Sequence, residues 1–165
     1  MTPSGEVVLP TSMANVELRS LTGRDAKIFF GLVDTNRDHL RQFGNYTELA
    51  GSTLEDITVY FANPPDKNIR VGVWVSGELA GRVDLNPVAP GTFVLGYWLG
   101  HAFTGRGYAT ESCRAILGYG RRSLGASEFW AGVTHGNLRS VAVLRRLGFT
   151  AVETLPDRTR FHLAE

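Results

Sequence analysis

The chain has 165 residues, 43% of them hydrophobic, a composition that excludes a disordered protein and predicts one domain over 1–165. Its one cysteine, Cys113, excludes an internal disulfide, and no apolar run is long enough for a membrane span, so we expect a cytoplasmic protein with no membrane partner. The formal net charge is +1, and the 19 glycines lack the three-residue period of collagen.

The first third of the chain is predicted to be mainly helical. Residues 1–14 have no signal-peptide pattern and are expected to form a loose arm, and 16–19 favours a short strand. Ser52 and Glu55 have the spacing of a capping box, and Pro64-Pro65 ends the helix that follows. The predicted helical segments are 22–33, 36–43 and 52–63.

The middle of the chain is strand-like in composition. Strands are predicted at 69–75, 79–85 and 92–99. The residues between the first two, 76–78, are typical of a hairpin, and 86–91 contains the proline and glycine of a turn. These segments predict an antiparallel meander.

The last third of the chain predicts two β-α-β steps. Cys113, Ile116, Leu117 and Leu124 recur at helical spacing on one face, and Gly125 follows where a helix would end. A second helix is predicted at 137–147, and strands at 127–133, 149–154 and 158–163. Together with the meander, this order favours an α+β fold (α/β in three layers) with one mixed sheet.

Charge is distributed unevenly along the chain. Residues 1–95 carry 8 basic and 11 acidic side chains, whereas 106–146 carries 7 arginines against two glutamates. Such a basic stretch indicates an anionic partner, although a solvated helix face would have the same composition.

The strand at 92–99 leads into a glycine-containing loop that opens a helix. Gly105 and Gly107 let backbone N–H groups face a ligand, the helix N-terminus favours an anion, and Arg106 adds a positive charge. These features predict a diphosphate site, although an ordinary strand-to-helix turn could have the same residues. A dinucleotide-binding loop is disfavoured because Thr110 stands where its third glycine would be.

Two polar residues stand at the start of the helix predicted at 137–147. Asn137 can cap this helix, and Ser140 follows three residues later, so both side chains face the helix start. Plain capping explains this pair without any function.

The two blocks together resemble motifs A and B of the GCN5-related N-acetyltransferases, the GNAT family, and among them the RimJ/RimL-like group. The resemblance covers roughly 15–163 and includes Asn36-Arg-Asp-His-Leu40 in the first third. The motifs that carry it are Gly96-Tyr-Trp-Leu99, Gly105-Arg-Gly-Tyr-Ala-Thr-Glu111, Asn137-Leu-Arg-Ser140 and Gly148-Phe149.

The resemblance implies a mixed, mostly antiparallel central sheet whose central strands splay apart and are flanked by helices. It also implies acetyl-CoA as cosubstrate without a metal, an amine acceptor rather than nucleic acid, and a possible homodimer. Ser140 matches the hydroxyl that protonates or hydrogen-bonds the departing CoA thiolate. The cofactor-binding positions that it implies are Trp98, Leu99, Thr104, Gly105, Arg106, Gly107, Tyr108, Ala109, Thr110 and Asn137.

Two positions depart from the family pattern. Thr104 stands where Gln or Arg is usual, which would either remove a diphosphate contact or move it to Arg106. Val94 stands where relatives often carry a glutamate that acts as the base. Asp84, on the neighbouring predicted strand, is the leading substitute for that catalytic base, although a solvent-facing or turn-capping carboxylate would look the same.

A site without a strong base favours an acceptor amine of low pKa. The pKa of an α-amine is about 7.7–8.0 and that of lysine about 10.4, so far more of the α-amine is neutral at pH 7. We therefore expect direct attack on the thioester by the α-amine of a protein N-terminus, peptide or aminoacyl compound. Two alternatives stay open: a small-molecule or antibiotic amine, whose positive charge the acidic first half would suit, and a non-catalytic acyl-CoA-binding sensor.

Overall fold

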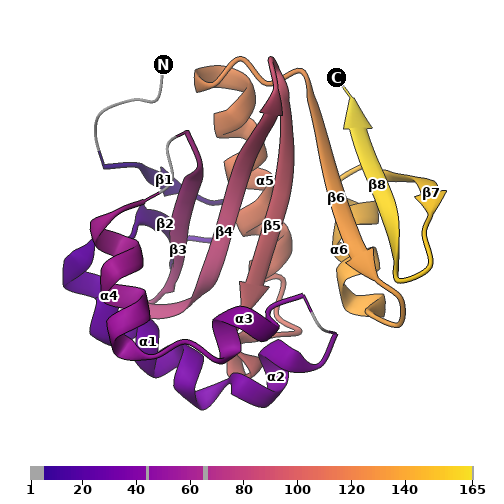
Figure 1. The fold of residues 1–165 in the computed structure, drawn as a ribbon. Helices are drawn as coiled ribbons and strands as arrows, with labels where there is room; N and C mark the ends of the chain where they lie inside the picture. The colour runs from indigo at the N-terminus through magenta and orange to yellow at the C-terminus, as the bar shows by residue number, and fades with distance from the viewer. Residues whose placement is uncertain (1–5, 44, 65–66, 165) are drawn as a thin grey trace.

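A mixed β-sheet runs through the molecule in the computed structural model, which describes residues 6–43, 45–64 and 67–164 (Figure 1). The strand order is β1-β2-β3-β4-β5-β6-β8-β7, and all neighbours are antiparallel except β5 and β6. The strands are β1 Val8–Pro10, β2 Val16–Ser20, β3 Ile69–Val75, β4 Glu78–Ala89, β5 Thr92–Leu99, β6 Glu128–Thr134, β7 Thr150–Thr154 and β8 Arg158–Ala164.

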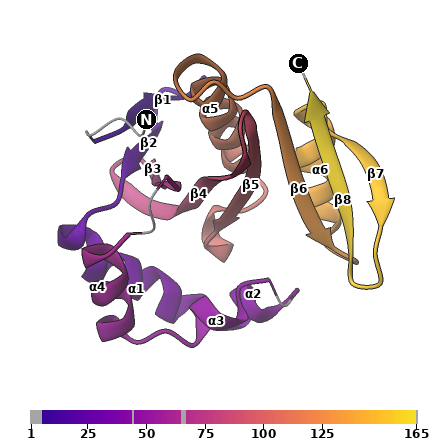
Figure 2. The ribbon, with the colours of Figure 1, turned by 45° about the horizontal axis from the view of Figure 1, so that its top comes forward.

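Helices cover the sheet on both faces, which gives the expected three layers. The N-terminal helices lie on one side and α5 and α6 on the other, as the turned view in Figure 2 makes clear. The helices are α1 Ala26–Thr35, α2 Arg37–Arg41, α3 Thr47–Ala50, α4 Leu54–Ala62, α5 Tyr108–Ser123 and α6 Leu138–Arg146, with short 3₁₀ segments at Gly23–Asp25 and His101–Phe103. No helix in these described ranges is long and apolar enough to cross a membrane.

The two faces of the sheet bury separate apolar clusters. On the α5 side, Ile116 and Cys113 are fully buried in the same cluster as Phe129 of β6, as the helical spacing predicted. On the other side, Phe29 of α1 packs edge-on against Trp98 of β5, with ring centroids 5.8 Å apart. Because side chains alternate along a strand, Tyr97 and Trp98 of β5 face opposite layers.

Two local predictions differ from the structure. The turn predicted at 86–91 is shorter, because β4 stays paired with β5 as far as Ala89 opposite Thr92. The capping box of α4 is formed by Thr53 and Asp56, one residue later than predicted. Its two hydrogen bonds run from Asp56 N to Thr53 Oγ1 at 3.1 Å and from Thr53 N to Asp56 Oδ2 at 2.9 Å.

The loose arm expected over 1–14 is wrong for the stretch that the structure describes. Val8–Pro10 pairs with β2, and Leu9 packs against the core. Val7 N donates a hydrogen bond of 2.7 Å to Ser20 Oγ. Residues 1–5 lie outside the described residues.

The parallel strands β5 and β6 stay together over a short distance only. Their pairing joins Thr92–Val94 to Glu128–Trp130, after which the two strands diverge, as Figure 1 shows. This is the splayed central pair that the family resemblance predicted. The divergence opens the sheet between the second half of β5 and the second half of β6.

Candidate active site

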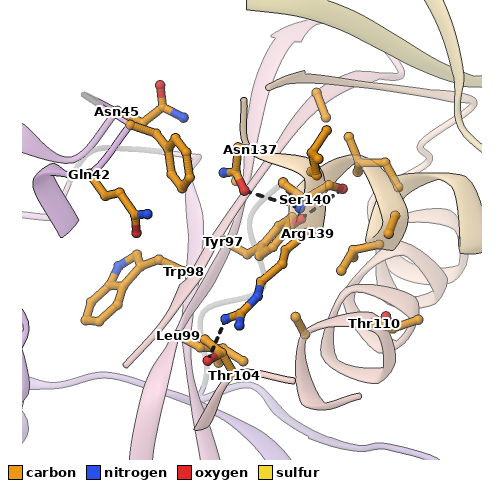
Figure 3. A pocket seen from close by; sticks show the side chains of 18 of the residues that line it. Gln42, Asn45, Tyr97, Trp98, Leu99, Thr104, Thr110, Asn137, Arg139 and Ser140 are labelled. Atoms are coloured by element: carbon orange, nitrogen blue, oxygen red, sulfur yellow. Dashed lines mark hydrogen bonds between the residues drawn. The ribbon is translucent and has the colours of Figure 1, made fainter. Parts of the chain in front are cut away.

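A cavity of about 690 Å³ lies where β5 and β6 part. Six parts of the chain line it: the α2–α3 segment, the second half of β5, the loop into α5, the first turn of α5, the middle of β6, and α6 with the residues just before it. Figure 3 shows Gln42, Asn45 and Trp98 on one side of β5 and Asn137, Arg139 and Ser140 on the other. The opening in the sheet therefore connects the two helical layers.

Most of the sequence-predicted site residues line this cavity. Arg106 and Asp84 are the two predicted residues that do not. Those that do are Trp98, Leu99, Thr104, Gly105, Gly107, Tyr108, Ala109, Thr110, Asn137 and Ser140.

The loop before α5 has the geometry of an anion cradle. Gly105 and Gly107 have positive φ of 76° and 85°, and no atom lies within 4 Å of where their Cβ atoms would be. Gly107 is the N-cap of α5, so the first N–H groups of a 16-residue helix open toward this loop. Thr110, in the first turn, has a buried hydroxyl without a hydrogen-bond partner among the described residues. Unfilled space and unpaired donors are what a diphosphate needs.

The start of α6 supplies a second polar edge. Asn137 Oδ1 accepts a hydrogen bond of 3.3 Å from Ser140 N, so the plain capping interpretation of Asn137 is correct. The cap uses the amide oxygen only, which leaves the amide NH₂ as the group that could donate to a ligand.

Ser140 shares a short hydrogen bond with a residue that sequence reasoning missed. Tyr97 Oη lies 2.5 Å from Ser140 Oγ, and either hydroxyl can be the donor. Burial raises the pKa of Tyr97, so its hydroxyl keeps its proton at neutral pH. The alternation of side chains along the predicted strand could have identified Tyr97, because every second residue of that strand faces the layer that contains α6.

Asp84 lies beside the cavity, on the face of β4 that is turned toward the N-terminal helices. It is 5% exposed, pairs in register with Gly96 of β5, and accepts a hydrogen bond of 2.8 Å from Asn86 Nδ2. Arg82 Nε is 3.7 Å from the Asp84 carboxylate. A Cβ at Gly96 would be only 2.9 Å from Asp84 Oδ2, so the carboxylate lies directly over this glycine, and Gly96 itself lines the cavity.

The α2–α3 segment closes one side of the cavity through three contacts to the sheet. Tyr46 Oη donates to Tyr97 O at 2.8 Å, and Thr134 Oγ1 donates to Asn45 Oδ1 at 2.6 Å. His39 Nε2 is 3.0 Å from the carbonyl oxygen of Leu99. Burial lowers the pKa of His39, so this ring is neutral at pH 7.

The cavity carries positive charge and no carboxylate among its described lining residues. Arg139 and Arg146 supply that charge, and the described lining contains no lysine. Cys113 does not line the cavity, and burial raises the pKa of its thiol, which excludes it as a nucleophile.

Residues 15–150 match the model of the acetyltransferase (GNAT) domain. The chain belongs to the GNAT family. Among relatives of this GNAT protein, a Bacillus subtilis (strain 168) protein named probable N-acetyltransferase YjcK is 31% identical over 145 residues, which cover 81% of this chain and 80% of that protein.

Solved structures with the same fold include several GNAT acetyltransferases. A RimL ribosomal L7/L12 alpha-N-protein acetyltransferase in complex with coenzyme A superposes with a TM-score of 0.84 at 22% identity, covering 96% of this chain and 98% of that one. Mycobacterium smegmatis RimJ in complex with a CoA-disulfide superposes with a TM-score of 0.82 at 18% identity, covering 99% of this chain and 88% of that one. The microcin C7 self-immunity acetyltransferase MccE in complex with acetyl-CoA and AMP superposes with a TM-score of 0.78 at 20% identity, covering 94% of this chain and 97% of that one.

This GNAT protein is therefore an acetyltransferase that uses acetyl-CoA as cosubstrate. The unfilled glycine cradle, the unpartnered Thr110 hydroxyl and the cationic lining fit the diphosphate of that cosubstrate. Within the described ranges, no three metal-ligating side chains come together.

Proposed function

We propose that this GNAT enzyme acetylates the α-amine of a protein N-terminus, a peptide or an aminoacyl compound. The observation that carries the proposal is the absence of any carboxylate from the described lining of the cavity. A polycationic acceptor such as an aminoglycoside would find no ion-pair partner there and would meet two arginines. The acidic balance of the first half of the chain therefore does not extend into the site.

The same absence favours an amine of low pKa. Without a carboxylate in contact with the acceptor, the enzyme depends on amines that are already partly neutral, as α-amines are at pH 7. The names of two similar proteins are consistent with this acceptor class: one is named "putative ribosomal N-acetyltransferase YdaF" and the other is a RimL ribosomal L7/L12 alpha-N-protein acetyltransferase.

The backbone holds and polarises the reactants in the proposed mechanism. The amides of 105–109 bind the diphosphate, Asn137 donates to the pantetheine arm, and an unpaired N–H of β5 stabilises the developing oxyanion. Acetyl-CoA, when bound, supplies an acyl group activated as a thioester. Much of the rate enhancement then comes from holding amine and thioester together in one cavity.

Two proton transfers complete the mechanism, one from the amine and one to the departing sulfur. As the C–N bond forms and the C–S bond breaks, the amine releases a proton. Because Asp84 does not line the cavity, that proton passes to its carboxylate through a water molecule beside Gly96, where no side chain intervenes. Ser140 donates a proton to the departing sulfur, and Tyr97, at 2.5 Å, replaces the proton that Ser140 gives up. Arg82 and Asn86 hold the Asp84 carboxylate in place.

The test is an acceptor panel with acetyl-CoA, followed by thiol release and by mass spectrometry of the product. The panel contains peptides with free α-amines, the same peptides blocked at the N-terminus but containing lysine, and aminoglycosides. We expect acetylation of the free α-amines in preference to the other two. Faster turnover of the blocked lysine peptides or of an aminoglycoside would overturn the proposal.

A further inference from the structure

Arg139 crosses the cofactor side of the cavity. It is the second residue of α6, and its guanidinium reaches the loop before α5, where Nη1 donates a hydrogen bond of 3.0 Å to Thr104 Oγ1 (Figure 3). The two residues are 35 positions apart in sequence, so no local motif predicts the contact.

Thr104 cannot serve as a phosphate donor in this arrangement. Its hydroxyl donates to His101 O at 2.8 Å, which uses its one proton, and its lone pair accepts from Arg139. The side chain therefore anchors Arg139 and offers no N–H or O–H to an anion. Any side-chain donor at this end of the loop has to come from another residue.

The charge at this end of the cavity belongs to Arg139 rather than to Arg106. Arg139 lines the cavity and forms no ion pair with any described residue, whereas Arg106, the loop's own arginine, does not line it. A guanidinium carries five N–H donors in a planar fork, and the bond to Thr104 occupies one of them. Unpaired N–H groups beside the glycine cradle suit the two acceptor oxygens of a phosphate.

We propose that Arg139 is a diphosphate-binding residue for acetyl-CoA and that Thr104 is the positioning residue that holds it toward the loop in the free enzyme. The diphosphate, bound by the amides of Gly105 and Gly107, receives its charge-assisted hydrogen bonds from α6. The anchor on Thr104 orders the arginine beforehand, so binding loses less side-chain entropy. The inference needs acetyl-CoA as cosubstrate but does not depend on which amine is the acceptor.

Binding measurements on the full chain test this assignment without any acceptor. The ligands are coenzyme A, 3′-dephospho-coenzyme A and pantetheine, titrated calorimetrically into the wild type, Arg139→Ala and the control Arg145→Ala, which alters α6 outside the cavity. Arg139→Ala should raise the Kd for the two diphosphate ligands by about tenfold or more and leave the pantetheine Kd unchanged. Arg145→Ala should leave all three unchanged.

Further variants separate the possible failures. Arg139→Lys should lose part of the affinity because it keeps the charge but not the fork, and Thr104→Val should lose two- to threefold because it releases the arginine. An effect on coenzyme A alone would assign Arg139 to the 3′-phosphate and overturn the proposal, as would an equal loss for pantetheine. A larger loss for Arg106→Ala than for Arg139→Ala would overturn it as well, whatever amine the enzyme acetylates.

Discussion

Two hydroxyl groups share one hydrogen bond at the centre of the site. Ser140→Ala should lower kcat by roughly 10²-fold, the usual scale for loss of general acid catalysis, while the Kd for coenzyme A changes less than about twofold. Tyr97→Phe, which keeps the ring, should lower kcat by about tenfold, because Ser140 loses the group 2.5 Å away that resupplies its proton. Steady-state kinetics and calorimetry measure both.

The double variant decides whether the pair acts as a unit. If Tyr97 works through Ser140, the combined loss in kcat should equal that of Ser140→Ala alone. Multiplying losses would show that the two hydroxyls act independently, and an unchanged kcat in Ser140→Ala would remove both from the proposed mechanism.

At the residue scale, the sequence allows prediction of groups that act through the local backbone. Gly105, Gly107 and Asn137 are predictable because a loop and a helix start determine what they do. Tyr97 and Arg139 are not, since each acts through a contact that only the tertiary fold creates.

At the element scale, variants at the start of α4 can distinguish the observed capping box, Thr53 with Asp56, from the predicted one, Ser52 with Glu55. Thr53→Ala should lower the free energy of unfolding by about 1 kcal/mol, because it removes the acceptor of the Asp56 N–H. Ser52→Ala should change it by less than about 0.5 kcal/mol, since the Ser52 hydroxyl only donates to Glu48 O at 3.3 Å. Urea denaturation measures both, and a larger effect at Ser52 would contradict the observed cap.

The strands show why element boundaries differ in predictability. Ile69–Val75 and Thr92–Leu99 are predicted with the observed bounds, because glycine or proline signals border apolar runs. The end of β4 is not, because pairing with β5 carries the strand past Pro87 to Ala89 despite the turn signal. Tertiary pairing overrides local preference there.

At the scale of the whole molecule, β1 closes the far edge of the sheet. Deletion of residues 1–10 removes its pairing with β2 and the partly buried side chain of Leu9, which should lower Tm by about 3–8 °C. The Kd for coenzyme A should be unchanged, because three strands lie between β1 and β5 in the sheet and no residue of β1 lines the cavity. Differential scanning fluorimetry and calorimetry provide the readouts.

A matched control uses the outward-facing neighbour on the same strand. Val8 is 55% exposed, so Val8→Ala should leave Tm within about 1 °C of the wild type. A truncated chain as stable as the full one would mean that this edge strand adds nothing to the fold.

The basic stretch at 106–146 is only partly explained by the cosubstrate. Arg139 and Arg146 line the cavity, but Arg114 pairs with Glu111 at 3.5 Å and Arg121 lies over the Phe129 ring at 5.3 Å. Charge counted along a sequence thus indicates an anion site without showing which arginines form it, because helices turn some of them to other surfaces.

The short pairing between β5 and β6 also determines how the backbone exchanges hydrogen with solvent. Beyond Val94 and Trp130 the facing edges of the two strands have no partner in the sheet, although each strand is paired along its other edge. Amides on those facing edges can exchange with deuterium without global unfolding, while amides of the same strands that face β4 or β8 stay protected. A ligand that fills the opening slows only the first group. Within one strand, the amides that face the opening therefore report whether a ligand is bound, and the amides on the other edge serve as their internal reference.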